Sequence, residues 1–512
     1  MALIQTAALR PNGSGLSNSE NYQTYCGLDC MLTHEIRTTL RDLGPEPPIY
    51  SFTRALQGPY LAMMKLGFRV DESARRYAVS TLYARKHLLQ QRLDMLSEAV
   101  WGKGLNSNSP AQLKDFLYDK MGLPEVWISK KGERKVSTGR EALEKLDQYL
   151  YAQPFIALVL ALRDIGKQLS VLDGAMDIED DGSKRFRAGY NITGTETGRP
   201  SSSENAFGSG SNAQNIASSL RYIFTSDPGK KLGVIDFEQV EARDVGFICG
   251  CLFDDWTFLD SCESGDLHTN NSKLIWPELP WTGDPKADRL VAEGQFYRDF
   301  SYRDMSKRGG HLTNYYGTAY TAARSLKVPI SIMVEFQNRY CKGPEAAFPA
   351  IPRWWAWIAQ QLQTEHKLST LFGLERYFFG RPDDDTTLRE AIAFIPQGTT
   401  GNRTNLALWR IWRYMPEVQV ISQTYDSVTF QYPEELERQV IPKALELMAV
   451  PLTSPSGRLY IVPGEAKIGW NWASVGRDGS NPYGLAKWSE SKPDKRKLPS
   501  GANRIAPGAV GD

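Results

Sequence analysis

Residues 232–243 read Leu-Gly-Val-Ile-Asp-Phe-Glu-Gln-Val-Glu-Ala-Arg. The apolar residues Leu232, Val234 and Ile235 predict a short buried strand. Helix-forming residues follow, so Asp236 falls at a predicted strand-to-helix junction. A carboxylate at the end of a buried strand is costly unless a cation or hydrogen bonds hold it.

A second aspartate lies in the turn of a predicted hairpin. Residues 418–431 are typical of a strand, a tight turn and a second strand, with Asp426 in the turn. Two aspartates from separate strands of one sheet could hold two Mg²⁺ ions about 3.5–4 Å apart, as phosphoryl transfer requires. Each aspartate alone is also explained by a structural role, as a helix N-cap or a hairpin residue, so other motifs must decide.

The composition is that of an ordinary globular protein. The chain has 512 residues, 41% of them apolar and 23% charged, which allows about two to four domains. The net charge of +1 means that any nucleic-acid surface must be a local patch. The six cysteines form no Cys-x-x-Cys pair, which suits a reducing cytoplasm. The longest apolar run, residues 154–162, is too short to span a membrane, and residues 1–8 lack the basic start of a signal peptide.

The N-terminal third is predicted to be mainly helical. We expect residues 1–20 to be loose, an amphipathic helix from Tyr25 to about Leu40, and a linker at residues 44–48. From Phe52 to about Val100 the pattern indicates one long helix. Its core candidates include Leu61, Met64, Leu82, Leu88 and Leu96.

A basic, aromatic-containing stretch follows. Polar turns at residues 105–113 and 136–139 each predict a capped helix. Residues 85–140 hold eleven Lys or Arg against six Asp or Glu, with Tyr118 and Trp127 among them. Such a surface could follow a phosphate backbone, although a solvated helix face is the more frequent explanation.

Two arginines near the middle of the chain suit contacts with DNA. Arg163 and Lys167 lie one turn apart on a helix predicted for residues 155–175. Arg199 stands in a Gly/Ser/Thr-rich loop, residues 195–203, whose hydroxyls and amides can bond phosphates. A flexible linker is the alternative for that loop.

Residues 301–321 predict a helix with one polar stripe, whose members recur every four residues: Arg303, Lys307, His311 and Tyr315. Lys307 and Tyr315 would lie roughly 12 Å apart, the length of a nucleotide. Gly309 and Gly310 each cost about 1 kcal/mol in a helix interior, which we interpret as a mild sign of function. An exposed basic helix face is the alternative.

The C-terminal third returns to the hairpin aspartate and then changes composition. A Trp-rich segment at residues 354–357 is helical in pattern, and Arg389 and Gln397 precede the hairpin. Residues 477–512 hold seven Lys or Arg against four Asp or Glu and are rich in Gly, Ser and Pro. This composition predicts a disordered basic tail.

Together these stretches, in this order over roughly residues 50–473, resemble the family A DNA polymerases, the class of bacterial DNA polymerase I and many phage replicative enzymes. Asp236-Phe-Glu-Gln-Val-Glu-Ala-Arg243 matches the family's first carboxylate motif, and Tyr425-Asp426-Ser427 matches the second. The resemblance implies that Asp236 and Asp426 hold two Mg²⁺ ions, which Mn²⁺ can replace. It also makes Glu241 the steric gate beneath the incoming sugar.

The resemblance extends to other motifs. Thr197-Gly-Arg199 matches the loop whose arginine reaches the minor groove at the primer terminus, and Gln397-Gly-Thr matches the motif that shares this contact. Lys307 and His311 would be catalytic by neutralising phosphate charge. The implied nucleotide-binding residues are Gln239, Glu241, Arg303, Lys307, His311 and Tyr315. The implied primer-template residues are Arg163, Lys167, Arg199, Arg389, Gln397 and Tyr425.

Three departures from the family's pattern stand out. Ser427 replaces a usual glutamate, while Glu238 replaces a usual serine and adds a nearby carboxylate. On the polar helix, the register Lys307, His311, Tyr315 competes with the register Arg308, Leu312, Tyr316. We prefer the first, because the second puts a leucine where a cation should meet phosphate.

The third departure concerns proofreading. Tyr25 and Asp29 look like the last motif of the family's exonuclease domain, but too few residues precede them to hold the two earlier acidic motifs. We therefore expect no intrinsic 3′-to-5′ exonuclease activity, and a separate exonuclease subunit that docks on residues 1–45. The thumb also lacks room for the insertion by which one phage polymerase recruits thioredoxin.

The resemblance implies an α+β, right-hand polymerase fold. Its expected parts are an exonuclease remnant (1–45), a helical thumb (46–154), a palm with an antiparallel sheet (155–265 and 373–475), helical fingers (266–372) and a disordered basic tail (476–512). The implied function is template-directed addition of deoxynucleotides to a primer 3′ end, in a phage and so in the host bacterial cytoplasm. A single-subunit RNA polymerase and a non-catalytic primer-template-binding subunit remain as alternatives; Glu241 argues against the first, and the two aspartates argue against the second.

Overall fold

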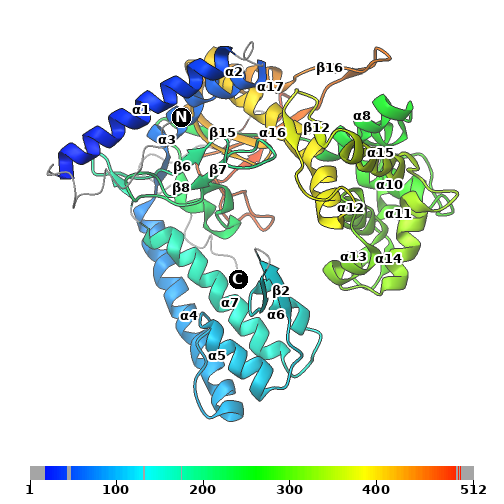
Figure 1. Cartoon of the computed structure of the whole chain (residues 1–512), viewed down its shortest axis with the longest axis horizontal. Helices are drawn as coiled ribbons and strands as arrows, with labels where there is room; N and C mark the ends of the chain where they lie inside the picture. Colours follow the sequence, from blue (N-terminus) through cyan, green and yellow to red (C-terminus); the bar gives the residue numbers. More distant parts are fainter. Residues whose placement is uncertain are drawn as a thin grey trace. The chain divides into compact units, whose positions relative to one another are not determined.

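The computed structural model describes residues 18–42, 48–130, 133–174, 176–491, 494 and 496. It divides the chain into two compact units, Met1–Ala55 and Leu56–Asp512. The first unit contains helices α1 (Asn18–Asp42) and α2 (Pro48–Ala55) (Figure 1). The helix predicted from Tyr25 to Leu40 is confirmed, but it begins at Asn18, so residues 18–20 are not loose. Residues 1–17 and most of the predicted linker lie outside the described residues.

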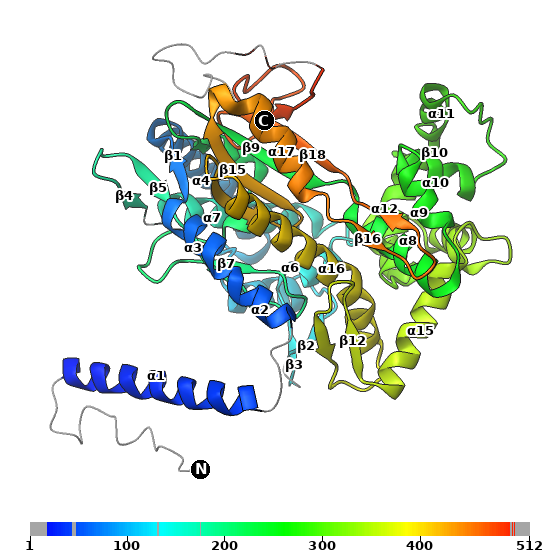
Figure 2. The same cartoon turned by 90° about the horizontal axis from the view of Figure 1, so that it is seen from above.

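A five-stranded antiparallel sheet forms the centre of the second unit, in the order β14-β15-β9-β18-β19 (Figure 2). Its central strand β9 (Lys230–Phe237) contains the predicted strand and Asp236. The predicted hairpin is β14 (Gln419–Thr424) and β15 (Ser427–Pro433), and β18 (Gly464–Gly469) and β19 (Ala486–Lys487) complete the sheet. The predicted α+β class with an antiparallel sheet is confirmed.

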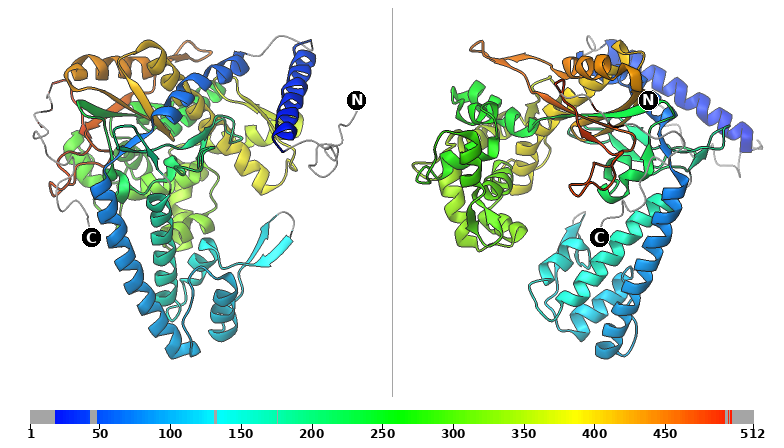
Figure 3. Two further views of the ribbon diagram at one scale, coloured as in Figure 1. Left: turned by 90° about the vertical axis from the view of Figure 1, so that its left-hand side faces the viewer. Right: turned by 180° about the vertical axis from the view of Figure 1, so that it is seen from behind.

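Two long helices, α4 (Glu72–Trp101) and α7 (Gln153–Asp173), pack side by side (Figures 1 and 3). Between them in sequence come α5 (Pro110–Lys114), a π-helical turn (Asp115–Lys120), the hairpin β2–β3 (Trp127–Lys130 and Glu133–Val136) and α6 (Arg140–Leu146). Leu93, Phe116 and Phe155 are among the residues of their shared core. The predicted turns are confirmed as helix starts, because the Ser109 side chain caps α5 and Gly139 is the N-cap of α6.

The single long helix predicted for residues 52–100 is wrong. The segment forms α2, α3 (Gln57–Leu66), strand β1 (Phe68–Val70) and α4. Gly67, with φ 64°, ends α3, and the Asp71 side chain accepts a hydrogen bond from the Ala74 N–H to start α4. β1 joins a sheet in the order β4-β5-β1-β8, whose other strands are Asp177–Ile178, Lys184–Phe186 and Phe224–Thr225. Leu61 and Leu88, predicted as core residues, are exposed.

A helical lobe is inserted after β9. Its helices are α8 (Val240–Phe253), α9 (Thr257–Glu263), α10 (Leu267–Ile275), α11 (Pro285–Ala292), α12 (Tyr302–Asn314), α13 (Ala319–Leu326), α14 (Ile330–Gln337) and α15 (Ala350–Thr364), with a small hairpin, β10–β11 (Gln295–Tyr297 and Phe300–Ser301), before α12. The Trp-rich segment lies in α15, as predicted, and Trp354 is fully buried.

Close packing explains the two glycines of α12. A Cβ atom at Gly309 would lie 2.9 Å from Cε1 of Phe336, and one at Gly310 would lie 3.2 Å from Cε2 of Tyr340. The two aromatic rings that pack against the helix therefore leave no room for a side chain at either position. Packing alone accounts for these two glycines, so they give no separate sign of function.

The chain then returns to the central sheet. Helix α16 (Asp385–Tyr414) follows the hairpin β12–β13 (Lys367–Ser369 and Glu375–Tyr377), and α17 (Glu437–Met448) precedes the hairpin β16–β17 (Leu452–Thr453 and Leu459–Tyr460). A further hairpin, β6–β7 (Gly189–Asn191 and Ser201–Ser203), carries the Gly/Ser/Thr-rich loop. Among the helices that the structure describes, each is too short or too polar to cross a lipid bilayer.

The disordered tail predicted from residue 476 is wrong for the residues described up to 491. Strand β19 pairs with β18, and Asn481 is buried, where it exchanges hydrogen bonds with Asn471. Sheet pairing thus overrides a polar composition. Apart from Asp494 and Arg496, the rest of the tail lies outside the described residues.

Candidate active site

The two predicted aspartates lie on neighbouring strands. Asp236 is in β9 opposite Ser427 of β15, and Asp426 precedes Ser427 in the hairpin turn. The Phe237 N–H donates to the carbonyl of Asp426 at 3.4 Å. Burial raises the pKa of both carboxyl groups, and the Asp426 carboxylate raises that of Asp236 further. The sheet therefore holds two carboxylates close together, in a setting that disfavours their negative charge.

This pair fits a hard divalent cation. Mg²⁺ prefers oxygen ligands, and protein sites often supply one or two carboxylates while water and substrate phosphates complete the octahedron. A bound cation would also remove the repulsion between the two aspartates. Among the described residues, no group of three or more His, Cys, Asp or Glu side chains could hold a metal ion, so further ligands would come from substrate and water.

The carboxylate of Glu241 is held from two sides. Glu241 lies in the first turn of α8, two residues after the N-cap Gln239, whose backbone is left-handed with φ 54°. Arg199, from the loop between β6 and β7, donates from Nη2 to one carboxylate oxygen, and the Tyr315 hydroxyl donates to the other. Three segments far apart in the sequence thus meet at Glu241. The predicted groove residue Arg199 is bound to this carboxylate in the structure.

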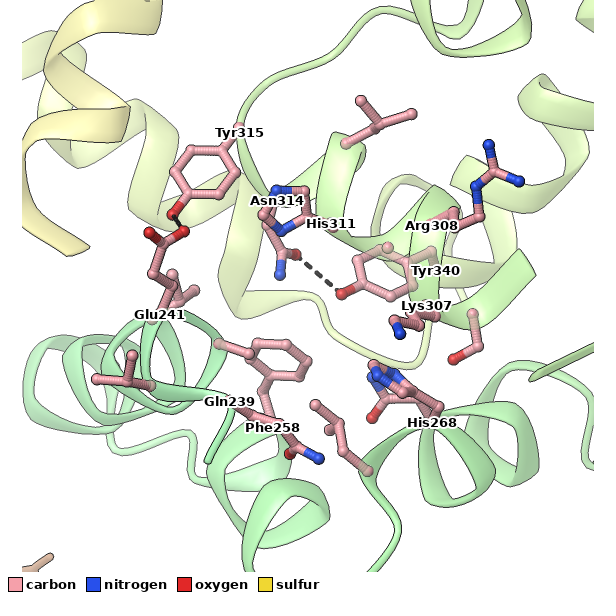
Figure 4. Close-up of a pocket in the computed structure, with 18 of the residues that line it drawn as sticks. Gln239, Glu241, Phe258, His268, Lys307, Arg308, His311, Asn314, Tyr315 and Tyr340 are labelled. Carbon is pink, nitrogen blue, oxygen red and sulfur yellow. Dashed lines mark hydrogen bonds between the residues drawn. The ribbon is translucent and has the colours of Figure 1, made fainter. Parts of the chain in front are cut away.

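A cavity of about 490 Å³ opens beside Glu241 (Figure 4). A cavity of this size can enclose much of a small molecule. The residues around it come from the start of α8, from α9, α10, α12 and α13, from a π-helical turn (Asn338–Lys342) and from the hairpin turn. Among them are Gln239, Glu241, His268, Lys307, His311, Tyr315 and Asp426.

Lys307, His311 and Tyr315 of the preferred register line this cavity, and so do Arg308 and Leu312 of the competing register. Lys307 and His311 lie on α12, but the helix ends at Asn314, so Tyr315 lies one residue beyond it and the stripe is not helical throughout. The Tyr316 backbone has φ 61°, and its ring packs edge-on against Trp355 at 5.2 Å between ring centroids. The competing Tyr316 is therefore directed to a different neighbour.

His268 is a cavity residue that sequence reasoning missed. It lies in the first turn of α10, and its Nδ1 is buried with no hydrogen-bond partner among the described residues. Burial, followed by the charge of Arg303, lowers the pKa of His268 to about 4, so the ring is neutral at pH 7. Arg303, predicted to bind the nucleotide, instead forms two 2.9 Å hydrogen bonds to Asp266. The rarity of histidine, five in the whole chain, was the available signal.

The predicted primer-template residues are scattered, and several have protein partners. Arg163 donates to the carbonyls of Ser107 and Thr138, each at 2.8 Å, and so ties the two polar turns together. Lys167, in contrast, is largely exposed. Arg389 pairs with Asp385 on the surface of α16, where Gln397 is half-buried. The Tyr425 hydroxyl donates to Asn215 at 2.8 Å.

The departures around Asp236 are explained by the sheet. The Ser427 hydroxyl donates to the Thr424 carbonyl at 2.8 Å, so it closes the hairpin turn and supplies no charge. On the other side of β9, Glu465 of β18 stands opposite Asp236. Sequence reasoning missed Glu465 because it could not reveal that β18 pairs with β9. Glu238 is half-buried at the end of β9, where its N–H donates to the Pro463 carbonyl.

The chain is similar to several known DNA polymerases. The model of the DNA polymerase family A matches residues 80–277. The thermostable DNA polymerase I of Thermus thermophilus is 27% identical over 430 residues, which cover 80% of this chain and 47% of that protein. DNA polymerase I of Helicobacter pylori is 24% identical over 422 residues, covering 78% and 42%. The chain thus spans about half the length of the curated relatives it matches.

A solved structure is similar in fold. The POL domain of Pol1 from M. smegmatis, in a complex with DNA primer-template and dNTP, matches with a TM-score of 0.63 and 20% sequence identity. The match covers 82% of this chain and 69% of that one. At this identity the likeness concerns the fold.

Proposed function

We propose that this chain, whose similarities support a family A DNA polymerase, extends the 3′ end of a DNA primer with deoxynucleotides under the direction of a template. The observation that carries the proposal is the pair of repelling carboxylates, Asp236 and Asp426, beside a cavity lined by Lys307 and His311. Paired carboxylates facing cationic side chains suit transfer of a nucleotidyl group from a triphosphate.

Asp236 and Asp426 would hold two Mg²⁺ ions, which Mn²⁺ can replace. When bound, the ions would lower the charge on the phosphates and the pKa of the primer 3′-hydroxyl. The protein's part is to fix both carboxylates through the β9–β15 pairing. Lys307 and His311 are exposed on the α12 side of the cavity, where they would neutralise triphosphate charge. His268, neutral with an unpaired buried Nδ1, would donate or accept a hydrogen bond there.

Glu241 would select the sugar. Its carboxylate is fixed by Arg199 and Tyr315, so it cannot swing aside cheaply to admit a 2′-hydroxyl. A rigid gate favours a DNA polymerase over the alternative of a single-subunit RNA polymerase. The two aspartates favour an enzyme over a non-catalytic binding subunit, because burying like charges would serve no structural purpose.

Primer-template DNA would lie along α4 and α7. The exposed Lys167 and the basic excess of residues 85–140 support this surface, while Gln397, Arg389 and Tyr425 would contact the duplex near the aspartates. The similar Pol1 domain was solved with DNA primer-template and dNTP. Phosphate contacts would position the duplex, and template bases would supply the sequence information.

The finer parts of the proposal concern proofreading and origin. We propose that these 512 residues lack 3′-to-5′ exonuclease activity and that a separate exonuclease docks on residues 1–45. Asp29 is exposed on α1, and the same helix exposes Met31, Ile36 and Leu40, which could contact a partner. The resemblance to phage enzymes supports a replicative role in a phage-infected bacterium.

Primer extension by the purified chain tests the function. We expect extension of a labelled primer on a DNA template with Mg²⁺ and deoxynucleotides, and little with ribonucleotides. Equal use of ribonucleotides would favour the RNA polymerase alternative. If the chain bound primer-template DNA but did not extend the primer with either Mg²⁺ or Mn²⁺, the non-catalytic subunit would be favoured.

A further inference from the structure

A buried ion pair lies one helical turn beyond the sugar gate. Asp244 of α8 is three residues after Glu241, and its Oδ1 accepts a 3.0 Å hydrogen bond from Nη2 of Arg403 in α16. Both side chains are completely excluded from solvent. The pair joins the helix that carries Glu241 to the long helix beside the central sheet.

Further hydrogen bonds satisfy the Asp244 carboxylate. The Tyr460 hydroxyl, from β17, donates to Oδ1 at 2.8 Å, and the Thr400 hydroxyl donates to Oδ2 at 3.3 Å. The Tyr460 ring also stacks on Phe247 of α8, with 4.3 Å between centroids. Arg403 in turn donates to the Val450 carbonyl at 3.2 Å. Three side chains from two segments, α16 and β17, therefore fix this one carboxylate.

Stability alone does not explain such a pair. Removing two charges from water costs several kcal/mol per ion, and apolar replacements of similar volume are often equally or more stable. Directional, charge-assisted hydrogen bonds, however, specify the rotation and translation of a helix more narrowly than apolar contacts do. The pair therefore fixes the rotation and translation of α8.

Helix α16 also supports the other partner of Glu241. Gly401 lies directly under Arg199, because a Cβ at Gly401 would be 3.0 Å from the Arg199 Cγ. The Asn405 side chain donates to the carbonyl of Gly198, next to Arg199, at 3.4 Å. One helix thus holds both the Arg199 loop and, through Arg403, the helix of Glu241.

We propose that Asp244 and Arg403 are positioning residues that align Glu241 with Arg199 and so set the discrimination between deoxy- and ribonucleotides. This inference rests on the proposed function, in which Glu241 is the sugar gate. The pair contacts no substrate itself. Its loss would widen the range of Glu241 positions and admit the 2′-hydroxyl, while the aspartates on β9 and in the hairpin turn keep their places.

The test compares variants that leave no buried charge unpaired. Asp244→Val/Arg403→Met removes both charges together, and Tyr460→Phe removes one hydrogen bond while keeping the stacked ring. The matched control is Arg458→Gln on the same β16–β17 segment, because Arg458 binds Asp260 at 2.6 Å and Glu263 at 2.7 Å on α9 and not on α8. Thermal unfolding of each variant is recorded beside its kinetics.

The readout is the ratio of kcat/KM for a ribonucleotide to that for the matching deoxynucleotide. We expect the double variant to raise this ratio about tenfold and Tyr460→Phe to raise it about threefold, with deoxynucleotide kcat/KM within about twofold of wild type. The control should leave the ratio unchanged. A structural role would lower Tm and activity for both nucleotides alike.

Other outcomes overturn the inference. An unchanged ratio in a folded double variant, while Glu241→Ala raises it, would show that Glu241 is the gate but is not positioned by this pair. If Glu241→Ala itself left the ratio unchanged, or wild type extended no primer, the proposed function would fail and this inference with it. If the double variant did not fold, the ratio measured for Tyr460→Phe tests the inference: an unchanged ratio would overturn it.

Discussion

The hydroxyl of Tyr315, one residue past the end of α12, donates a hydrogen bond to the carboxylate of Glu241 in the first turn of α8. Burial, with the nearby Glu241 charge, raises the pKa of Tyr315 well above its usual value, so the hydroxyl keeps its proton as a donor. The contact joins the end of α12 to the proposed gate.

Tyr315→Phe is therefore expected to loosen sugar selection. Glu241 would keep Arg199 but lose its second partner, a hydrogen bond to a charged group worth about 1.5–3 kcal/mol. We expect ribonucleotide incorporation to rise about three- to tenfold relative to deoxynucleotides. Tyr316→Phe is the control, because that ring packs against Trp355. A larger effect in the control would favour the competing register with Arg308 as the phosphate contact.

Asp236→Asn and Asp426→Asn should each abolish extension, by at least about a thousandfold, while primer-template binding survives. Burial raises the pKa of both carboxyl groups, which means that their charges oppose folding at neutral pH. Each variant should consequently unfold at the same or a higher temperature than wild type in EDTA. Extension assays test the predicted loss of activity, and thermal melts test the predicted unfolding temperature.

Mg²⁺ provides the matching control. Wild type should gain thermal stability with added Mg²⁺, because a ligand of the folded state shifts the equilibrium, and the double Asp→Asn variant should not. Near wild-type extension by either single variant at saturating Mg²⁺ would refute the assignment of both aspartates as metal ligands.

The local patterns in the sequence correctly predicted the strand of Asp236 and the hairpin of Asp426. The apolar run before Asp236 and the strand-turn-strand pattern around Asp426 are short-range signals, and the sheet contains both. The sequence also contains a signal for the break at Gly67, because a glycine and a capping Asp71 stand where one helix ends and the next begins. The helical periodicity of the segment nevertheless led to the prediction of one helix. Tertiary contacts such as Arg199 with Glu241 carried no local signal, because their partners are distant in sequence.

Gly309→Ala should destabilise the protein although alanine favours helix. A Cβ there would lie 2.9 Å from the Phe336 ring and 3.0 Å from the Met305 sulfur, both in the core. Overpacking of this kind costs about 1–3 kcal/mol, which exceeds the gain in helix propensity of about 1 kcal/mol. Chemical denaturation measures the difference. Gly166→Ala, on α7 with open space at its Cβ, is the control and should be neutral or stabilising; a stabilised Gly309→Ala would contradict the packing explanation.

The purified chain should leave a mismatched primer end intact. Asp29 is the one carboxylate of the matched exonuclease motif, and a single carboxylate cannot hold two metal ions. Degradation of a labelled mismatched primer, measured without nucleotides, is the assay, with Asp236→Asn as a control for pyrophosphorolysis. Deleting residues 1–45 should abolish binding of the partner exonuclease and leave extension intact. Undiminished binding by the truncated chain would remove α1 from the docking surface.

Arg163 and Lys167, predicted together as DNA contacts, should behave differently. Arg163 is half-buried and donates to the Ser107 and Thr138 carbonyls, so Arg163→Ala leaves two acceptors unpaired and should lower the free energy of unfolding by about 1–3 kcal/mol. Lys167 is exposed, and Lys167→Ala should leave Tm unchanged but weaken DNA binding and reduce the slope of log K against log salt by about one. Fluorescence anisotropy with labelled primer-template at several salt concentrations separates the two effects. If Arg163→Ala changed the salt slope and not the Tm, Arg163 would be a phosphate contact after all, and its bonds to the two turns would be replaced when DNA binds.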